Sequence, residues 1–254
     1  EPPPAEPVET PRPTARNHRS TDDALGAGGP KTRFAANVAA IRTLKQIEDE
    51  GRGATQPEQE LLARYVGWGG LADAFDDGAE SWQKEYAELK GLLTPDEYDK
   101  ARASVLNAHY TPPVVVKAIY DAIGQMGFQR GNVLEPSCGT GNFFGLVPEE
   151  MRGAKLYGVE LDDISARIAD KLYPSATIVN SGFEKTNFPD SFFDVVVGNV
   201  PFGDYKAYDQ DYNRHNFFIH DYFIAKSIDK VRAGGVVALV TSNGVSGGTF
   251  DKRD

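Results

Sequence analysis

Four consecutive residues, Asn199-Val200-Pro201-Phe202, combine a side-chain amide, a carbonyl fixed by proline and an aromatic ring. They follow the apolar run 192–197, which predicts a buried strand, and Gly198, which lets the backbone turn. Asn199 is therefore expected just past the carboxyl end of a strand, where ligands bind in open α/β sheets. The amide, the carbonyl and the ring could together hold a planar group that carries an NH2.

A second group of residues with chemical potential is the segment Glu135-Pro136-Ser137-Cys138-Gly139-Thr140-Gly141. Its glycines leave room for a ligand near the backbone, and the helix expected after them offers free N–H groups. Glu160 closes the next predicted strand, where an acidic residue can accept hydrogen bonds from ribose hydroxyls. The alternative role, an acidic helix cap, suits Asp162 or Asp163 equally well, so we assign the ribose contact to Glu160. The third glycine of a dinucleotide fingerprint is missing, which disfavours a nicotinamide-dependent dehydrogenase.

The elements that must position these residues divide the chain into three parts. Residues 1–30 hold seven of the sixteen prolines and almost no apolar residues, which predicts a disordered, proline-rich linker. Residues 31–108 are predicted to be a helical subdomain, because apolar residues recur with helical spacing from Phe34 to Ile47. Thr55 with Glu58, and Thr94 with Glu97, form two further helix-start patterns.

Residues 109–254 alternate short apolar strands with helical stretches. The pattern predicts an α/β fold, a Rossmann-like parallel sheet with helices on both faces. The predicted strands are 132–134, 155–159, 176–179, 193–197 and 236–240, and the predicted helices between them are 162–172 and 217–231. The chain starts with Glu and ends in an apparent loop, so we expect a fragment whose sheet is truncated at the C-terminus.

Composition excludes several classes of protein. No apolar run approaches the roughly 20 residues that span a bilayer, and there is no signal-peptide pattern, so no membrane partner is expected. A single cysteine, Cys138, and four scattered histidines predict neither disulfides nor a metal site, and a reducing cytoplasm is the simplest location. The net charge of −10 argues against a stand-alone DNA binder, yet it allows an enzyme that takes one nucleotide into a pocket.

Taken together, the motif Glu-Pro-x-Cys-Gly-x-Gly, the acidic end of the second strand and Asn-x-Pro-Phe after the fourth resemble those of S-adenosylmethionine-dependent N6-adenine methyltransferases. His109-Tyr110-Thr111-Pro112-Pro113 resembles the cofactor motif that precedes the glycine loop in DNA enzymes with this motif order; it is also an ordinary proline-containing helix start. The resemblance implies S-adenosylmethionine as cofactor. The residues that it implies for cofactor binding are Tyr110, Thr111, Glu135, Pro136, Cys138, Gly139, Gly141, Glu160 and Phe183.

One position departs from the family. At the end of the third strand the family places an Asp before an apolar residue, for the adenine of the cofactor, whereas this chain has Gly182 before Phe183. Phe183 can still pack on the adenine ring and donate its backbone N–H. A non-catalytic interaction module with the same fold stays an alternative because of Gly182.

A closer resemblance covers roughly residues 34–252. Tyr65-Val66-Gly67-Trp68-Gly69-Gly70, Gly198-Asn199-Val200-Pro201-Phe202-Gly203 and Gly248-Thr249-Phe250-Asp251-Lys252 are similar to large methyltransferase–helicase fusions of phages and conjugative elements, some of which serve anti-restriction. The resemblance implies a helicase domain beyond this chain. Trp68 more simply joins the helical subdomain to the main body than it contacts substrate.

For the chemistry, the resemblance implies adenine in DNA as the acceptor. The Asn199 side-chain oxygen and the Pro201 carbonyl would accept the two N–H groups of the exocyclic amine and aim its lone pair at the cofactor methyl. Phe202 would stack on the flipped base. Val200 replaces the usual proline of DNA enzymes, which this mechanism tolerates because it uses the carbonyl of Pro201.

Several questions stay open at this point. The loop from Tyr205 to Asn216, with Tyr205 and Tyr208, either stacks on the substrate strand or is a mobile lid or surface loop. RNA adenine methyltransferases and a protein-glutamine methyltransferase use similar Asn-x-Pro-aromatic motifs and remain alternatives, although the acidic charge disfavours RNA. Target sequence and oligomeric state cannot be predicted from these residues.

Overall fold

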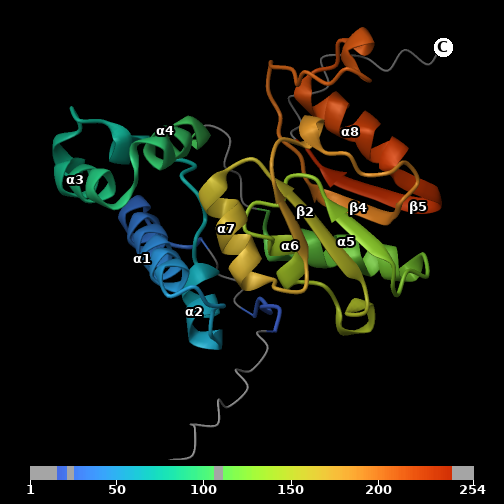
Figure 1. Cartoon of the computed structure of the whole chain (residues 1–254), viewed down its shortest axis with the longest axis horizontal. Helices are drawn as coiled ribbons and strands as arrows, with labels where there is room; N and C mark the ends of the chain where they lie inside the picture. Colours follow the sequence, from blue (N-terminus) through green and yellow to red (C-terminus); the bar gives the residue numbers. More distant parts are fainter. Residues whose placement is uncertain (1–15, 22–25, 106–110, 242–254) are drawn as a thin grey trace, which may run out of the picture.

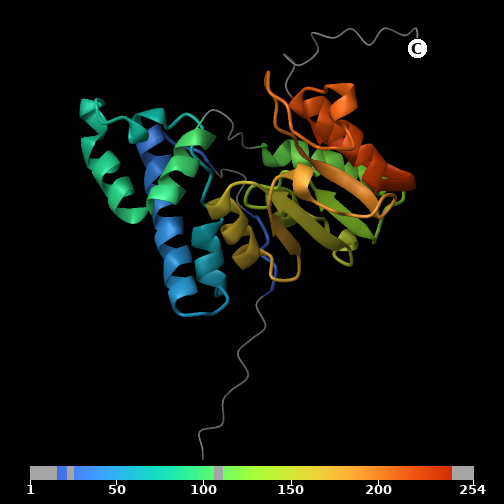
Figure 2. The same ribbon diagram turned by 45° about the horizontal axis from the view of Figure 1, so that its top comes forward.

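The computed structural model describes residues 16–21, 26–105 and 111–241. A helical subdomain lies at one side of the molecule and a sheet with its covering helices at the other (Figure 1). Figure 2, turned by 45°, shows the same two parts in contact through α7 (Asp163–Leu172), the helix of the sheet domain that lies nearest the subdomain.

The helical subdomain consists of α1 to α4: α1 (Pro30–Asp49), α2 (Gln56–Leu62), α3 (Gln83–Leu92) and α4 (Pro95–Ser104). Both predicted capping boxes are confirmed, since Thr55 N donates to Glu58 Oε2 at 2.8 Å and Thr94 N to Glu97 Oε2 at 2.9 Å. Short 3-10 turns complete the chain: η1 (Ala72–Phe75), η2 (Glu80–Trp82), η3 (Glu149–Met151), η4 (Phe183–Lys185) and η5 (Asn213–His215).

The turn around Trp68 is built into the core of the subdomain. The Trp68 ring is fully buried and meets Phe34 and Phe75 at centroid distances of 6.2 and 5.3 Å. Asn37 of α1 fixes the turn backbone, because its side chain donates to Gly67 O at 2.7 Å and accepts from Val66 N at 3.0 Å. Trp68 therefore has a structural role, as expected from the sequence.

Five parallel strands form the sheet, in the order β3-β2-β1-β4-β5. Their bounds are β1 (Asn132–Glu135), β2 (Lys155–Glu160), β3 (Thr177–Asn180), β4 (Phe193–Asn199) and β5 (Val231–Val240). All five predicted strands are confirmed, and the predicted fold class is confirmed with them. The fifth strand begins five residues earlier than predicted, because Val231 pairs with Phe193 before a register irregularity.

Alternate strand residues point into two hydrophobic clusters, one on each face of the sheet. Val133, Val195 and Val197 join one cluster, which continues without a break into the helical subdomain. Leu134, Val159 and Val196 join the other, which α8 (Ile219–Lys230) covers. The first cluster also receives residues of α5 (Pro113–Gln125), α6 (Asn142–Gly145) and α7. Because both faces are covered, the strands read as continuous apolar runs.

The N-terminal segment differs from the prediction. Residues 16–21 lie against the sheet domain, since His18 N donates to Leu172 O at 2.7 Å and Ser20 N to Gly145 O at 3.0 Å. The prediction of a disordered linker is wrong for these residues, because their backbone groups find partners that composition cannot reveal. Helix α1 also begins at Pro30, within the predicted linker. Among the described residues, no helix is both long and apolar enough to cross a bilayer.

Candidate active site

The strand order reverses between β1 and β4, and open α/β sheets bind ligands at the carboxyl edge of such a point. Glu135 is the last residue of β1 and Asn199 the last residue of β4. Glu160 ends the neighbouring strand β2. The topology thus brings the two predicted groups of residues, which are more than 60 positions apart in the chain, to one edge of the sheet.

Glu160 is held by two backbone N–H groups. Its Oε2 accepts from Gly139 N at 2.7 Å, and its Oε1 accepts from Asp162 N at 2.7 Å. Asp162 is the residue that caps α7, because its Oδ2 accepts from Ser165 N at 2.8 Å. Asp162 is therefore the helix cap, and Glu160 faces the glycine loop. The ribose contact of Glu160 stays a prediction.

The two glycines of this loop, residues 135–141, differ in what their missing side chains allow. A Cβ at Gly139 would meet nothing within 4 Å, so open space lies beside this residue, whose φ is +54°. A Cβ at Gly141 would collide with the ring of Tyr173, so this glycine is explained by packing. Cys138 is buried, and its Sγ lies close to Gly158, so packing also explains this residue. Helix α6 after the loop has only four residues.

Two carboxyl groups lie together at this edge, with Glu135 buried and Glu160 half-buried. Burial raises the pKa of Glu160 to about 7, against the opposing effect of its backbone N–H donors. Burial and then the charge of Glu160 raise the pKa of Glu135 well above its usual range. Glu135 Oε2 is also buried without a hydrogen-bond partner among the described residues. Such a site is complementary to a ligand with a cationic group and with N–H or O–H donors.

The remaining predicted cofactor residues lie in different surroundings. Pro136 and Thr111 are buried, and Tyr110 lies outside the described residues. The Phe183 ring is 1% exposed and packs against Phe223 at a centroid distance of 5.2 Å, so in this structure it belongs to the core. Its contact with cofactor stays a prediction.

Gly182 has an acidic neighbour that the sequence did not suggest. A Cβ built at Gly182 would collide with the carboxylate of Glu184, which therefore occupies the space of a side chain at position 182. An acidic group is present at the end of β3 after all, supplied by η4 two residues later. No spacing rule could have found it, because the fold of this turn places the side chain.

The backbone around Asn199 is fixed from two sides. Ser137 Oγ donates to Asn199 O at 2.7 Å, which ties the glycine loop to the end of β4. Val200 N donates to Val240 O at 3.0 Å and thereby extends the pairing with β5. Val200 is 1% exposed, so it anchors the segment in the core. Among the described residues, no hydrogen bond occupies the Asn199 side chain, which leaves its amide available.

Gly198 allows this arrangement. Its φ is +150°, and a Cβ there would lie 3.2 Å from Glu135 Cγ, tighter than an ordinary contact. The carboxyl ends of β1 and β4 can therefore approach closely only with glycine at this position. The sequence predicted a turn at Gly198 but not its contact with Glu135. It also did not predict the hydrogen bond from Ser137 to Asn199 O.

The aromatic residues after Asn199 are spread over a longer loop. Pro201 and Phe202 are half-buried at the edge of the sheet. Tyr205 is 43% exposed, with its ring against the backbone of Gly203, whereas Tyr208 is 77% exposed. The structure thus brings Asn199, Pro201 and Phe202 together by chain continuity and places both tyrosines on the same loop.

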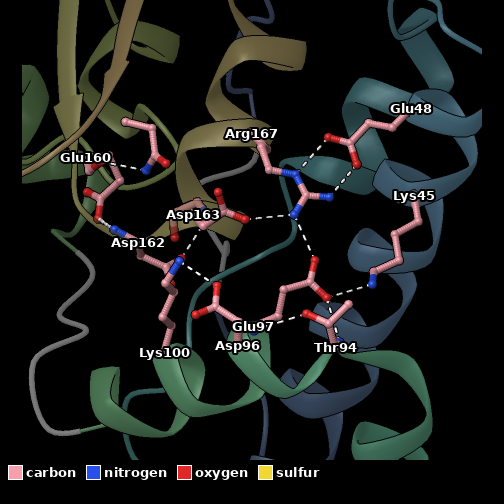
Figure 3. Close-up of polar contacts among 12 residues, drawn as sticks. Lys45, Glu48, Thr94, Asp96, Glu97, Lys100, Glu160, Asp162, Asp163 and Arg167 are labelled. Atoms are coloured by element: carbon pink, nitrogen blue, oxygen red, sulfur yellow. Dashed lines mark hydrogen bonds and ion pairs between the residues drawn. The ribbon is translucent and has the colours of Figure 1, made fainter.

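The helical subdomain is fastened to α7, next to the Glu160 edge (Figure 3). Arg167 of α7 forms a bidentate ion pair with Glu48 of α1 and donates to Glu97 of α4 at 2.8 Å. Lys45 donates to the other oxygen of Glu97 at 2.7 Å. Burial alone would raise the pKa of Glu97, yet Lys45 and Arg167 lower it to about 2. The subdomain and the Asp162 cap of α7 are therefore held in one arrangement.

Comparisons with known proteins agree with this architecture. A protein-family model, the one described as Methyltransferase domain, matches residues 134–203. The matched segment contains the glycine loop, Glu160 and the Asn199–Phe202 tetrapeptide. A solved structure from Listeria monocytogenes, described as a class I S-adenosylmethionine-dependent methyltransferase, has the same fold, with a TM-score of 0.50 and 17% identity. The alignment covers 86% of this chain and 76% of the Listeria chain.

Three viral proteins are related in sequence. Defense against restriction protein B of Escherichia phage P1 is 27% identical over 233 residues, which are 90% of this chain but 9% of that protein. Modification methylase CviBIII of Paramecium bursaria Chlorella virus NC1A is 28% identical over 59% of this chain and 41% of its own length. Type II methyltransferase M.CvrRI of Paramecium bursaria Chlorella virus XZ-6E is 29% identical over 46% of this chain and 27% of its own. The chain spans less than half the length of each of these relatives.

The fold and the family match over residues 134–203 are those of a methyltransferase domain that uses S-adenosylmethionine. The residues present fit this cofactor on three observations: the open space beside Gly139, the Glu160 carboxylate and the unpartnered Glu135 oxygen. A carboxylate at a strand end suits ribose hydroxyls, and the unpartnered Glu135 oxygen suits an N–H donor of the cofactor, such as its ammonium group.

Proposed function

We propose that this protein transfers a methyl group from S-adenosylmethionine to the N6 amine of adenine in DNA, with the base flipped into the Asn199–Phe202 segment. The observation that carries the proposal is the placement of Asn199, at the carboxyl end of β4 beside the glycine loop, with its amide available and its carbonyl held by Ser137. The relatives include a defence-against-restriction protein and a modification methylase, and restriction and modification act on DNA, which supports DNA as the substrate.

The chemistry follows from what these residues can bind. When bound, S-adenosylmethionine supplies an electrophilic methyl group. The exocyclic amine of adenine is a weak nucleophile, because its lone pair is delocalised into the ring. Asn199 Oδ1 and the Pro201 carbonyl would accept its two N–H groups and orient the lone pair towards the methyl donor. Phe202 would stack on the flipped base and offset part of the stacking that it lost.

On the cofactor side we propose three roles. Glu160 accepts from the ribose hydroxyls, and Glu135 with the backbone around Gly139 binds the amino-acid part. Glu184 takes the place of the acidic residue that is missing at Gly182 and accepts from the cofactor adenine, because its carboxylate lies over that glycine. The further cofactor contacts, Tyr110, Thr111, Pro136, Cys138, Gly141 and the Phe183 backbone, remain predictions of the same proposal.

The wider context is also a proposal. The phage P1 relative is about eleven times longer than the matched part, since the match is 9% of its length. This supports a larger fusion protein of a mobile element, with a helicase domain as its partner and anti-restriction or self-modification as its role.

The test is methyl transfer from tritiated S-adenosylmethionine to DNA, RNA and protein, with the methylated product identified by mass spectrometry as N6-methyladenine or another species. Asn199→Ala is expected to lower the rate on DNA by about 10²–10³-fold, because a positioned transition-state contact is lost. Cofactor affinity measured by calorimetry should stay unchanged. Asn187→Ala, which changes an exposed asparagine outside the Asn199–Phe202 segment, is the matched control.

Three results would contradict the proposal. Retained turnover of Asn199→Ala would remove the residue from the mechanism. Methylation of RNA or of a protein glutamine in preference to DNA would mean that the same site acts on another substrate. Binding of S-adenosylmethionine without any methyl transfer would favour a non-catalytic module.

A further inference from the structure

The loop between the Asn199–Phe202 segment and α8, residues 203–218, is anchored by a buried ion pair. Asp209 Oδ2 accepts from Lys226 Nζ at 2.9 Å and from the Tyr222 hydroxyl at 2.7 Å. The side chains of Asp209 and Lys226 are 8% and 5% exposed. The same Lys226 donates to Phe183 O at 2.8 Å, which ties the loop to the end of β3. We call residues 203–218 the aromatic loop.

Burying two charges has a large desolvation cost, so such a pair is a poor way to gain stability. It is, however, a good way to fix one geometry, because an alternative position of the loop would leave one charge buried without its partner. Asp209 Oδ1 also accepts from Asp211 N at 3.2 Å, and Asn213 Oδ1 accepts from Asp209 N at 3.0 Å. The loop is therefore held in a defined shape, although it carries little regular structure.

The aromatic loop exposes large rings and two cations, Lys206 and Arg214, together with two acids, Asp204 and Asp211. Tyr208 and Phe218 are 77% and 44% exposed, far more than an aromatic residue with only a packing role. Lys206 Nζ lies 5.5 Å from the centre of the Phe218 ring, and Arg214 is the middle residue of η5. Within the described part of the chain, neither Lys206 nor Arg214 forms an ion pair with a carboxylate, so both charges are available to a ligand.

This surface is continuous with the proposed base-binding segment. The Tyr205 ring lies 3.1 Å from the Cβ position of Gly203, the residue after Phe202. Ile219 N donates to Tyr205 O at 2.9 Å, which brings Phe218 to the start of the loop. A base held at Phe202 would thus have the rings of Tyr205 and Phe218 near it, where the neighbouring nucleotides of its strand must pass.

Aromatic rings interleaved with cations are the usual means of binding single-stranded nucleic acid, because every base offers a face for stacking. A duplex hides those faces and is bound mainly through phosphates by clustered Lys and Arg. The chain carries a net charge of −10, which opposes general duplex binding. Flipping a base is also easiest from a strand that is already unpaired.

We propose that the aromatic loop is a strand-binding surface, on which nucleotides flanking the target base stack on Tyr208 and Phe218 while Lys206 and Arg214 contact their phosphates. The substrate is accordingly an unpaired DNA strand rather than intact duplex. This inference rests on the proposed function for the identity of the target base, but strand binding itself does not depend on methyl transfer.

The experiment measures binding of a fluorescein-labelled single-stranded DNA oligonucleotide by anisotropy, without cofactor, beside the duplex and the RNA strand of the same sequence. The wild-type protein is expected to bind the single strand at least roughly tenfold more tightly than the duplex. The double variant Tyr208→Ala/Phe218→Ala should weaken single-strand binding by about 10-fold or more, since stacking contributes about 1–3 kcal/mol per base. Arg214→Gln should reduce the salt dependence, by about 0.7 in the slope of log K against log salt.

The matched control is Val114→Ala/Met126→Ala, which shortens one side chain of α5 and one directly after it, 71% and 69% exposed. It should bind as the wild type does. Wild-type-like binding by the loop variant, equal binding of duplex, tighter binding of RNA, or no binding of single strands would each overturn the inference. The two proposals can be tested separately. If the protein methylates DNA but the loop variant binds the strand as the wild type does, only the strand-binding surface is contradicted. If strand binding depends on the loop but no methylation is found, only the proposed function is contradicted.

Discussion

The two halves of the candidate site are built in different ways. In the cofactor half, backbone N–H groups hold a carboxylate, as when Glu160 accepts from Gly139 N and from Asp162 N. In the acceptor half, side chains and the backbone of β5 hold the chain: Ser137 and Val240 hold Asn199-Val200, and Lys226 holds the aromatic loop.

This difference matters for what each half can do. The cofactor half needs a fixed pocket for one invariant molecule, and a strand end with a tight loop supplies it. The acceptor half must receive a macromolecule, and loops on a rigid scaffold usually carry such contacts. Its geometry consequently depends on a few anchoring interactions, each of which can be removed separately.

The largest effect is expected from Lys226→Met in the acceptor half. Asp209 would keep its buried charge without its partner, at a cost of about 3–5 kcal/mol in the free energy of unfolding. Urea unfolding measures the loss. Lys230→Met is the control, because its partner Asp190 is 73% exposed, and it should cost less than about 1 kcal/mol. Equal effects of the two substitutions would show that the buried pair is not the anchor.

Val200→Pro tests the second anchor. Proline has no N–H to donate to Val240 O, so an acceptor of β5 would be left unpaired at a cost of about 1–3 kcal/mol in stability. Methyl transfer should fall with it, since Asn199 precedes the altered bond, whereas Val200→Ile keeps the N–H and should stay active. Full activity of the proline variant would mean that pairing with β5 does not position Asn199.

The cofactor half should respond to pH instead. The pKa of Glu160 is raised to about 7, so the folded protein holds this proton to a higher pH than an ordinary carboxyl group. Only the ionised form is a full acceptor for ribose hydroxyls. Affinity for S-adenosylmethionine is therefore expected to rise as pH increases from 6 to 8, by roughly tenfold for this group. Calorimetry at several pH values checks it, and Glu160→Gln should remove that part of the rise; an identical profile in the variant would exclude Glu160.

The smallest effect is expected from Ser137→Ala, which removes the hydrogen bond from Ser137 to Asn199 O that joins the two halves. Loss of one hydrogen bond of about 1 kcal/mol should lower the turnover number about 3–10-fold while cofactor affinity stays the same. Ser137→Thr should restore turnover, because it keeps the hydroxyl. Ser104→Ala, which also loses a bond to a backbone carbonyl, at 2.8 Å, is the control. A change in cofactor affinity alone would place Ser137 in the cofactor half.

The comparison also explains which predictions from the sequence succeed. The five strands follow from apolar runs and the two capping boxes from residue spacing, and all are confirmed. Residues 16–21 were misassigned, because their partners Leu172 and Gly145 are distant in the chain. Ser137 at Asn199 was missed for the same reason. Glu184 was missed although it is close in the chain, because only the fold of its turn places its carboxylate over Gly182.

The sequence alone determined the sheet, the order of its elements and the segments expected at its edge, because these depend on local patterns and on chain direction. It also determined that Asn199, Pro201 and Phe202 stay together, since they are consecutive. Only the tertiary structure decided which carboxyl groups lie together at the edge of the sheet. It also decided that Arg167 fixes the helical subdomain, and that Asp209 and Lys226 anchor the aromatic loop. These features depend on pairs of residues far apart in the chain, whose meeting no local pattern specifies.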